Sequence, residues 1–586
     1  MKLAVLLGLP ATILSAVYAA TDPHEYREHL HLKPLPGGSL YAGFSFNATT
    51  SLGSYDKQHY RYFPRSLAQI LHYTHTAELH LRFSLGRWDE ETWGSRPRSG
   101  LREGGNGVEL WAWLESDAER KAEERWSDLV NSLSGLFCAS LNFIDSGKTV
   151  RPLLSFDPEG SLREYQAMQE RVTGRGQGEL QLLHGMLPHE VVCTENLTPF
   201  LKLLPCKGKA GISSLLDGHK VFDSEWQTMS VDVRPACHAS GTSWECQLEI
   251  QQTVDMVLNT ERSQRPHDDP IPRPKPIEEI KCDASKSYNG EDTCYPVAFE
   301  GEQEWTLSKI FGRPLRASCL ASGSDTHDVS LAVPSERTVE VISKSTVSHE
   351  GDNSTRSYYL PDDTDFDLHL PQQVLASNQQ ESETASVHAS RQITGYGQER
   401  GGMHTTLHNP HPWPQDVIYL ESLPWFLRPY VHTLSLSAGT IKKTYYTPLL
   451  DRQRGTQLEL LIELPAESTV ELTYDFEKAI LRYSEYPPDA NRGFDIPAAV
   501  IRVLPGNSTL GAPTRENYLR TTSLLLPLPT PDFTKVRQGL AGLKKLLAKS
   551  KAGVNAGDES NGKTMQESSS PVKEENGRPK EHKKSR

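Results

Sequence analysis

The chain has 586 residues and a formal net charge of −13 at pH 7, with 62 Lys and Arg against 75 Asp and Glu. This length exceeds what one hydrophobic core usually serves, so we expect more than one domain. The acidic balance argues against a nucleic-acid-binding protein, because the phosphate backbone attracts basic surfaces.

Residues 1–20 have the pattern of a secretory signal peptide. Lys2 precedes an apolar run, and small residues at Ala19 and Ala20 close it. Pro10 interrupts the run, which favours a cleaved leader over a retained signal anchor. We therefore expect the rest of the chain to enter an oxidising compartment.

Residues 21–240 combine helix and strand patterns, which predicts an N-terminal α+β domain. A helix is expected over 63–73, and another is expected to start at Ser116, where Ser116 and Glu119 have the spacing of a capping box. Alternating apolar and polar side chains predict strands over 39–46, 78–84 and 107–114.

Residues 241–326 are expected to form a disulfide-bearing insertion or linker. Their middle part, 260–300, is rich in Pro, Asp, Glu and Lys. That composition is typical of exposed segments between packed elements.

The eight cysteines all lie between positions 138 and 319, and disulfides are the default state in an oxidising compartment. Their spacing does not fit a zinc site. Cys282 and Cys294 flank a polar loop, so we expect a local bridge between them. Cys193 could pair with Cys206, with a more distant cysteine or with another chain, and spacing alone leaves these alternatives open. The cysteines are Cys138, Cys193, Cys206, Cys237, Cys246, Cys282, Cys294 and Cys319.

Residues 327–515 show short alternating segments separated by Pro, Gly and Asn turns, for example over 430–436, 457–463 and 469–476. This pattern predicts an antiparallel β-sandwich, so the fold class is α+β and β-rich. Residues 516–550 include a basic amphipathic stretch, which is too charged to span a bilayer. Residues 551–586 are charged and poor in apolar side chains, which predicts a disordered tail.

Four Asn-x-Ser/Thr acceptors follow the leader, and we expect them to be surface sites for N-linked glycans. Pro199 directly follows one of them, which lowers the expectation of a glycan there. The acceptors are Asn47, Asn196, Asn353 and Asn507.

Several patterns could indicate metal or catalytic chemistry, but each has a structural alternative that we favour. For two groups of histidines the sequence shows no nearby carboxylate that would orient them, and the acidic segment 362–367 lacks the glycine and terminal glutamate of a calcium loop. The segment 87–94 places carboxylates between two tryptophans, as in sugar-binding clefts, yet sequence neighbours cannot flank a sugar ring. We expect no catalytic residue, metal or cofactor. The histidines are His72, His75, His80, His404, His408 and His411.

Long blocks of the chain resemble the PIG-T-type subunit of the glycosylphosphatidylinositol (GPI) transamidase. They run in order across residues 25–533, so the resemblance is close to full length. The blocks are His80–Trp88, Leu133–Asp145, Val191–Pro199 with Leu203–Cys206, Ser422–Thr433, Glu485–Phe494 and Leu524–Phe533.

The resemblance implies a non-catalytic scaffold on the luminal side of the endoplasmic reticulum membrane. Its partners would be a caspase-like cysteine protease subunit, the other membrane subunits and, through the complex, the GPI lipid and the C-terminal signal of a proprotein. By position, Cys193 would form an interchain disulfide with the protease. Asn491 would be a candidate contact with the partner or substrate, although a turn residue beside Gly493 is an equal alternative.

Two points stay open at this stage: how the chain would be anchored to the membrane, and one alternative function. Family members usually continue past the block ending at Phe533 into a membrane-spanning helix, which is not visible in this sequence. The alternative function is a secreted carbohydrate-active hydrolase or a sugar-binding β-sandwich protein that uses the segment 87–94.

Overall fold

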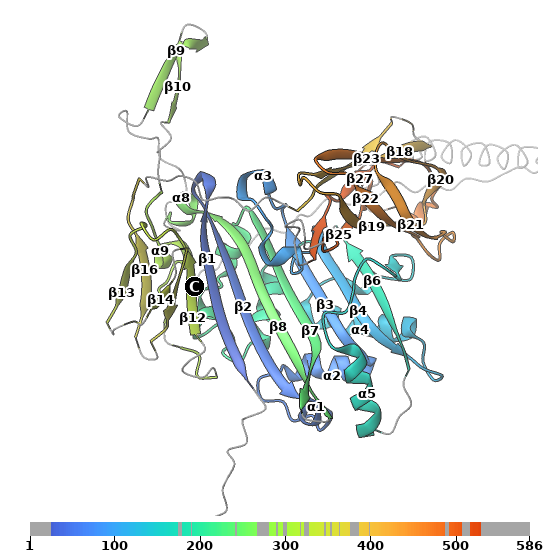
Figure 1. Ribbon diagram of the computed structural model, residues 1–586, viewed down its shortest axis with the longest axis horizontal. Coiled ribbons are helices and arrows are strands. Elements are labelled where there is room, and N and C mark those ends of the chain that lie inside the picture. Colours follow the sequence, from blue (N-terminus) through green and yellow to red (C-terminus); the bar gives the residue numbers. More distant parts are fainter. Residues whose placement is uncertain are drawn as a thin grey trace, which may run out of the picture. The chain divides into compact units, whose positions relative to one another are not determined.

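A large, mostly antiparallel sheet forms the centre of the N-terminal part of the chain in the computed structural model (Figure 1). Strand β1 lies between β2, its antiparallel partner, and β12, its parallel partner. Among the described residues the sheet has 11 strands. In spatial order they are β14 (His349–Gly351), β15 (Thr355–Tyr359), β12 (His327–Ala332), β1 (Tyr26–Leu35), β2 (Ser39–Ser51), β8 (Ser243–Asn259), β7 (Trp226–Ser240), β3 (Thr76–Leu85), β4 (Gly107–Ser116), β6 (Glu179–Leu187) and β5 (Thr149–Val150).

The structure describes most of the chain from Glu25 to Leu528, and these residues belong to one compact unit. The described residues are 25–173, 178–188, 190–240, 243–265, 280–288, 291–296, 302–316, 318–321, 327–344, 347, 349–351, 354–361, 364–374, 386–395, 397, 399–486, 492–506 and 516–528.

Helices cover one face of the large sheet. Apolar residues alternate along β3, where Leu79, Leu81 and Phe83 share one buried cluster with Leu129 of α4 and Phe200 of α6. The helices are α1 (Leu52–Asp56), α2 (Arg65–Thr74), α3 (Glu90–Trp93), α4 (Ala122–Phe137), α5 (Leu162–Thr173), α6 (Thr194–Leu203), α7 (Gly218–Phe222), α8 (Thr260–Ser263) and α9 (Leu307–Phe311). Short 3-10 turns are η1 (Pro36–Gly38), η2 (Pro97–Gly100), η3 (Leu141–Phe143), η4 (Ile212–Leu215) and η6 (Tyr483–Glu485).

The opposite face of the sheet carries polar and charged side chains that are also buried. On β3, Glu78, His80 and Arg82 alternate with the apolar residues, and each is at most 1% exposed. Alternation is therefore present in β3, but it separates an apolar face from a charged one rather than from solvent.

The C-terminal β-sandwich predicted from the sequence is confirmed. Two sheets enclose a shared apolar cluster that includes Leu407, Tyr419, Leu460 and Leu472. One sheet has the order β17 (His388–Thr394), β18 (Arg400–Asn409), β23 (Ser468–Lys478), β20 (Leu427–Leu436). The other has the order β21 (Thr440–Thr447), β22 (Thr456–Leu464), β19 (Gln415–Leu423), β25 (Val500–Val503), β26 (Asn517–Arg520).

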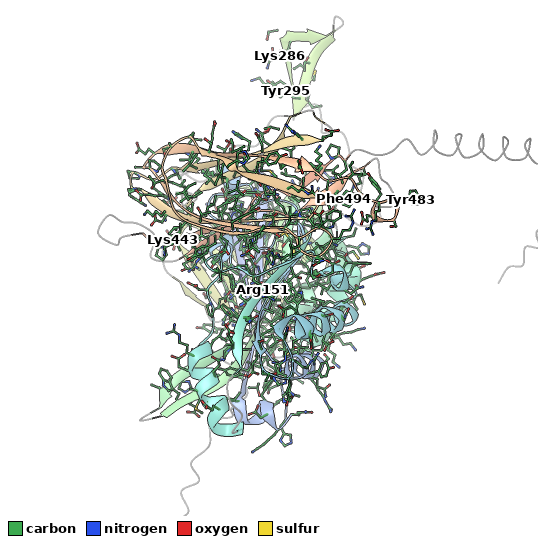
Figure 2. All side chains as sticks on the ribbon, turned by 90° about the vertical axis from the view of Figure 1, so that its right-hand side faces the viewer. Arg151, Lys286, Tyr295, Lys443, Tyr483 and Phe494 are labelled. Atoms are coloured by element: carbon green, nitrogen blue, oxygen red, sulfur yellow. A yellow bond between two sulfur atoms is a disulfide. The ribbon has the colours of Figure 1, made fainter. Side chains whose placement is uncertain are left out.

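Smaller sheets complete the described part of the chain. Lys286 and Tyr295 in Figure 2 belong to the hairpin of β9 (Ile280–Tyr288) and β10 (Glu291–Pro296). The others are the sheet β11 (Trp305–Thr306), β16 (Phe366–Leu370), β13 (Glu340–Ser343) and the pair β24 (Phe494–Ile496), β27 (Leu524–Leu526).

The element boundaries differ from those expected in three places. Strand β8 lies in the range expected as a linker, yet it pairs with both β2 and β7, because its long alternating pattern fits the sheet interior. Strands β12 and β15 lie in the range expected as sandwich, yet they extend the large sheet. Strand β26 lies in the range expected as an amphipathic segment, yet it belongs to the sandwich.

The capping box expected at Ser116 and Glu119 is wrong. Ser116 is the last residue of β4, where it pairs with Glu179, and α4 begins only at Ala122. The Oδ1 atom of Asp117 instead accepts hydrogen bonds from the backbone of Glu119 and Arg120, which forms a turn between the strand and the helix.

The sandwich is joined to the large sheet through buried polar groups. The Glu459 carboxylate of β22 accepts hydrogen bonds from the backbone N–H groups of Leu153, Leu154 and Ser155, at 2.8, 2.8 and 3.1 Å. Gln457 binds both backbone groups of Arg151, which Figure 2 labels at this junction. Such buried groups are costly to separate, because each would lose its partner.

Candidate functional site

Six of the eight cysteines are paired within the chain. The disulfides join Cys206 to Cys319, Cys237 to Cys246 and Cys282 to Cys294. The last is the local pair expected from the sequence, and it connects β9 to β10. The remaining two, Cys138 and Cys193, are unpaired; the first is exposed and the second is partly exposed. Local pairing of Cys193 with Cys206 is excluded, because Cys206 is bonded to Cys319.

Cys193 occupies the N-cap position of α6. The residue is extended there, with φ −150° and ψ −171°, and the helix begins at Thr194. On the N-terminal side, Val192 is buried and anchors the segment, while Val191 is 74% exposed. The thiol therefore lies at the edge of the fold rather than in its core.

Asn196 links Cys193 to Cys138. Its Oδ1 atom accepts a hydrogen bond from the Cys193 N–H at 2.9 Å. Its Nδ2 atom donates to the carbonyl oxygens of Phe137 and Cys138 at 3.1 and 3.2 Å. One buried amide thus fixes the start of α6 against the end of α4, where both unpaired cysteines lie.

An open groove of about 560 Å³ begins beside Cys138. Its walls come from the start of α2, the end of α4 and one face of α6. The lining is mainly apolar, with charged side chains only from α6. The lining residues are Ser66, Leu136, Cys138, Glu195, Thr198, Pro199, Lys202 and Leu203.

Comparison with known proteins decides the family. The profile described as "Gpi16 subunit, GPI transamidase component" matches residues 10–535. The chain belongs to the Gpi16 family. It is 36% identical to the GPI transamidase component GPI16 of Saccharomyces cerevisiae, over 87% of this chain and 84% of that protein. It is 34% identical to the PIG-T homolog of Schizosaccharomyces pombe, over 88% of this chain and 86% of that protein. It is 33% identical to PIGT of Homo sapiens, over 87% of this chain and 85% of that protein.

The resemblance found in the sequence is therefore confirmed, and this Gpi16-family chain is a component of a GPI transamidase. The family name implies a membrane complex. In the described part of the chain, no helix has both the length and the apolar content needed to cross a bilayer.

The glycan acceptors of this Gpi16-family chain differ in accessibility. The expectation of a surface site at Asn196 is wrong for the folded chain, because the residue is 1% exposed and its Nδ2 atom makes two hydrogen bonds. Asn47 is partly buried in β2, between Arg27 of β1 and Gln251 of β8. Asn353, Asn507 and the candidate contact Asn491 lie outside the described residues.

A buried charged cluster surrounds His80 on the polar face of the large sheet. His80 Nδ1 lies 2.7 Å from Asp232 Oδ1, and His80 Nε2 lies 2.8 Å from Glu78 Oε1. Burial alone would lower the pKa of His80, but the negative charge of Glu159 and the bonds to Asp232 and Glu78 raise it to about 8. His80 is therefore a cation at neutral pH.

The same cluster offers donor atoms of His80, Glu159 and Asp232 within 4.8 Å of one another. Two arginines already neutralise these carboxylates: Arg82 lies 2.6 Å from Asp232, and Arg102 donates to both oxygens of Glu159 at 2.7 Å. An added cation would face three positive side chains, so the arrangement fits an internal ion-pair network rather than a metal site.

The other histidines make separate structural contacts. His75 pairs with Glu115 at 3.1 Å, and His72 lies against Tyr55. His408 contacts Thr469, and His411 stacks on Trp413. Each of these four histidines therefore contacts a side chain of the protein itself.

Two of the carboxylates of the segment 87–94, Asp89 and Glu90, are also engaged in structural contacts. Asp89 caps α3 by accepting from the N–H groups of Glu91 and Thr92. Glu90 binds Arg96 at 2.5 Å and His388 at 3.0 Å. This arrangement gives no support to the hydrolase alternative, since a glycosidase needs two carboxylates that face a sugar.

Sequence reasoning missed two disulfides and the role of Asn196. For Cys237 and Cys246 a signal was present: Ala239-Ser-Gly-Thr-Ser243 is a turn sequence between two alternating segments, which places the cysteines opposite each other. For Cys206 and Cys319, 113 positions apart, no local pattern could have found the pair.

Proposed function

We propose that this chain is a non-catalytic scaffold subunit of the GPI transamidase, joined to the protease subunit by an interchain disulfide at Cys193. The observation that carries the proposal is the unpaired, partly exposed Cys193 in a chain whose other cysteines, Cys138 apart, are bonded to each other. In an oxidising compartment such a thiol is available for a partner chain.

The surroundings of Cys193 support a docking role. Val191, two residues before Cys193, exposes an apolar side chain. The apolar groove runs along α6, the helix whose N-cap is Cys193. Exposed apolar surface of this kind marks interaction sites. A covalent tether would raise the effective concentration of the partner at this surface and make a weak contact persistent.

The proposal places the described body on the luminal side of the endoplasmic reticulum membrane, where it would hold the caspase-like protease subunit and help to shape the path of the proprotein signal. Asn491 remains a candidate contact in this path. The leader at residues 1–20 and the three disulfides support a luminal compartment.

Non-reducing electrophoresis of native material tests the tether. We expect a disulfide-linked adduct in the wild type and in Cys138→Ser, and only the monomer in Cys193→Ser. Serine is a favoured N-cap residue, so Cys193→Ser should fold. An adduct that persists in Cys193→Ser and disappears in Cys138→Ser would assign the interchain bond to Cys138 and overturn the proposal.

Processing of a proprotein with a GPI signal tests the scaffold role. Cells that lack this chain should accumulate the uncleaved proprotein, and the wild-type chain should restore processing. Normal processing in its absence would contradict the role. We expect the Cys193→Ser chain to restore processing of the proprotein only in part, because this variant keeps the docking surface but loses the disulfide tether.

A further inference from the structure

A second pocket lies on the polar face of the large sheet, between β1, β2 and the segment that leads from α3 into η2. Its volume is about 320 Å³, within the range of roughly 300–1,000 Å³ typical of ligand sites. Most of its lining consists of cationic side chains, aromatic rings and histidines, and Leu35, Ser95 and Pro97 complete it. None of the described residues that line this pocket is acidic.

The sheet register places the floor of the pocket. Lys33 of β1 pairs with Tyr41 of β2, and His31 pairs with Gly43. A Cβ atom at Gly43 would lie 2.4 Å from the Tyr41 hydroxyl and 2.8 Å from Asp255. The glycine therefore leaves room for the 2.8 Å hydrogen bond that the Tyr41 hydroxyl donates to Asp255, which fixes the ring in the floor.

The two arginines of the pocket are fixed by carboxylates that do not line it. Arg98 Nε donates to both oxygens of Asp255 at 3.1 and 3.2 Å, yet a quarter of its side chain is exposed. Arg96 is fixed by Glu90 and Glu103. The carboxylates lie behind the guanidinium groups, so the pocket wall itself presents positive groups in fixed positions.

Lys33 adds a cation that makes no ion pair with any described carboxylate. Burial lowers the pKa of His31, and the positive charges of His29, Arg98 and Lys33 lower it further, to about 4. His31 is then neutral at neutral pH and shares a 2.8 Å hydrogen bond with Ser330 through Nδ1. A pocket with this charge pattern favours an anion.

Aromatic rings form the remaining wall. Trp88 is buried against Tyr41 and Trp226, and Trp93 packs edge-on against Trp88 with ring centroids 5.1 Å apart. Trp93 itself is partly exposed at the pocket. A partly exposed indole ring offers an apolar face to which the C–H face of a sugar ring can pack.

We propose that this pocket binds a sugar that carries a phosphate group. Arg98 and Lys33 would bind the phosphate oxygens, and Trp93 would pack against the sugar ring. The site is independent of Cys193, so it goes beyond the scaffold role. Its ligand could be a soluble sugar phosphate or the sugar-phosphate head of a lipid, which share this chemistry.

Titration of the full chain, monitored by tryptophan fluorescence, tests the pocket. The probes are mannose 6-phosphate, mannose alone and inorganic phosphate. We expect saturable binding of mannose 6-phosphate and at least about tenfold weaker binding of the other two, because each makes only half of the contacts. Lys33→Gln and Trp93→Ala should each weaken binding about tenfold.

Lys57→Gln is the matched control, since Lys57 is exposed beyond the far end of β2 and should leave binding unchanged. Lys33 is partly exposed, so its replacement should not prevent folding, and a near-ultraviolet circular dichroism spectrum checks this. Vesicles that contain a lipid-linked mannosyl phosphate should displace the soluble sugar phosphate if the natural ligand is a lipid head group, and leave it bound if the natural ligand is soluble.

Two results would overturn the proposal. If mannose 6-phosphate does not bind saturably, the pocket is not a ligand site. If inorganic phosphate binds equally well, the pocket does not recognise the sugar. Neither result depends on the disulfide-linked adduct at Cys193, so failure of the pocket proposal can be distinguished from failure of the proposed function.

Discussion

The guanidinium of Arg520, on β26 of the sandwich, binds the carboxylate of Glu109, on β4 of the large sheet, with Nε and Oε2 3.2 Å apart. Both side chains are at most 3% exposed. Burial alone would raise the pKa of Glu109, but the charges of Arg520 and His184 hold it well below its usual value. The carboxylate is therefore ionised, and its partner comes from the opposite end of the sequence.

Replacing Arg520 should destabilise the whole described body. Arg520→Met leaves the Glu109 charge buried without its main partner, which costs about 3–5 kcal/mol of unfolding free energy. Urea unfolding measures the loss. Arg313→Met is the matched control, because Arg313 pairs with Asp217 at the surface and such pairs contribute about 0–1 kcal/mol. Similar small losses in both variants would show that the Arg520 pair is not a structural link.

Asn196 should act as a structural residue and not as a glycan acceptor. Thr198→Ala removes the acceptor motif while leaving the amide of Asn196 in place, so the electrophoretic mobility of the chain should not change. Asn196→Ala should cost about 2–3 kcal/mol, because three hydrogen bonds are lost and two carbonyl groups lose a partner. A faster-moving Thr198→Ala chain, matched by glycosidase treatment of the wild type, would contradict the structural role.

The fold class and the strands were predictable where one face of a strand differs from the other. The alternation in β2, β22 and β23 gave strands within a few residues of the observed bounds. The domain limits were not predictable, because β12 pairs with β1 and β8 pairs with β2, although each pair is far apart in the sequence. Local patterns carry no information about such partners.

The candidate site was predictable only in part. The sequence singled out Cys193, but it could not show that Cys206 is bonded elsewhere or that Asn196 is buried. The charged cluster at His80 escaped notice because only Glu78 is near His80 in the sequence, whereas Glu159 and Asp232 come from distant parts of the chain. Burial of paired charges leaves no signature in hydropathy, since the residues are polar whether they face solvent or the interior.

The disulfides should differ in what they stabilise. Replacing Cys206 and Cys319 with alanine opens a loop of 113 residues and empties a buried position at Cys319, so unfolding free energy should fall by about 4–5 kcal/mol. Replacing Cys282 and Cys294 frees only a two-stranded hairpin, and the urea midpoint of the body should stay unchanged. An equal loss in both double variants would mean that the hairpin is integral to the core.

The cluster at His80 should make stability depend on pH in a defined window. His80 titrates near 6.5 when unfolded and near 8 when folded, so its contribution is complete below pH 6.5 and is lost as the pH rises through 8. Glu159 behaves in the opposite way: burial would raise its pKa, but His80 and Arg102 lower it to about 2, so its contribution is lost as the pH falls from 4.5 towards 2.

Unfolding free energies of the wild type and of His80→Gln, measured between about pH 6 and pH 9, test the alkaline side of this window. The wild type should lose of the order of 2 kcal/mol more than the variant over that range, because only the wild type releases the His80 proton. His59→Gln, a change at an exposed histidine, should follow the wild-type curve. Parallel curves for the wild type and His80→Gln would show that His80 is neutral in the folded chain, and that Asp232 draws its compensation from Arg82 and Arg102 alone.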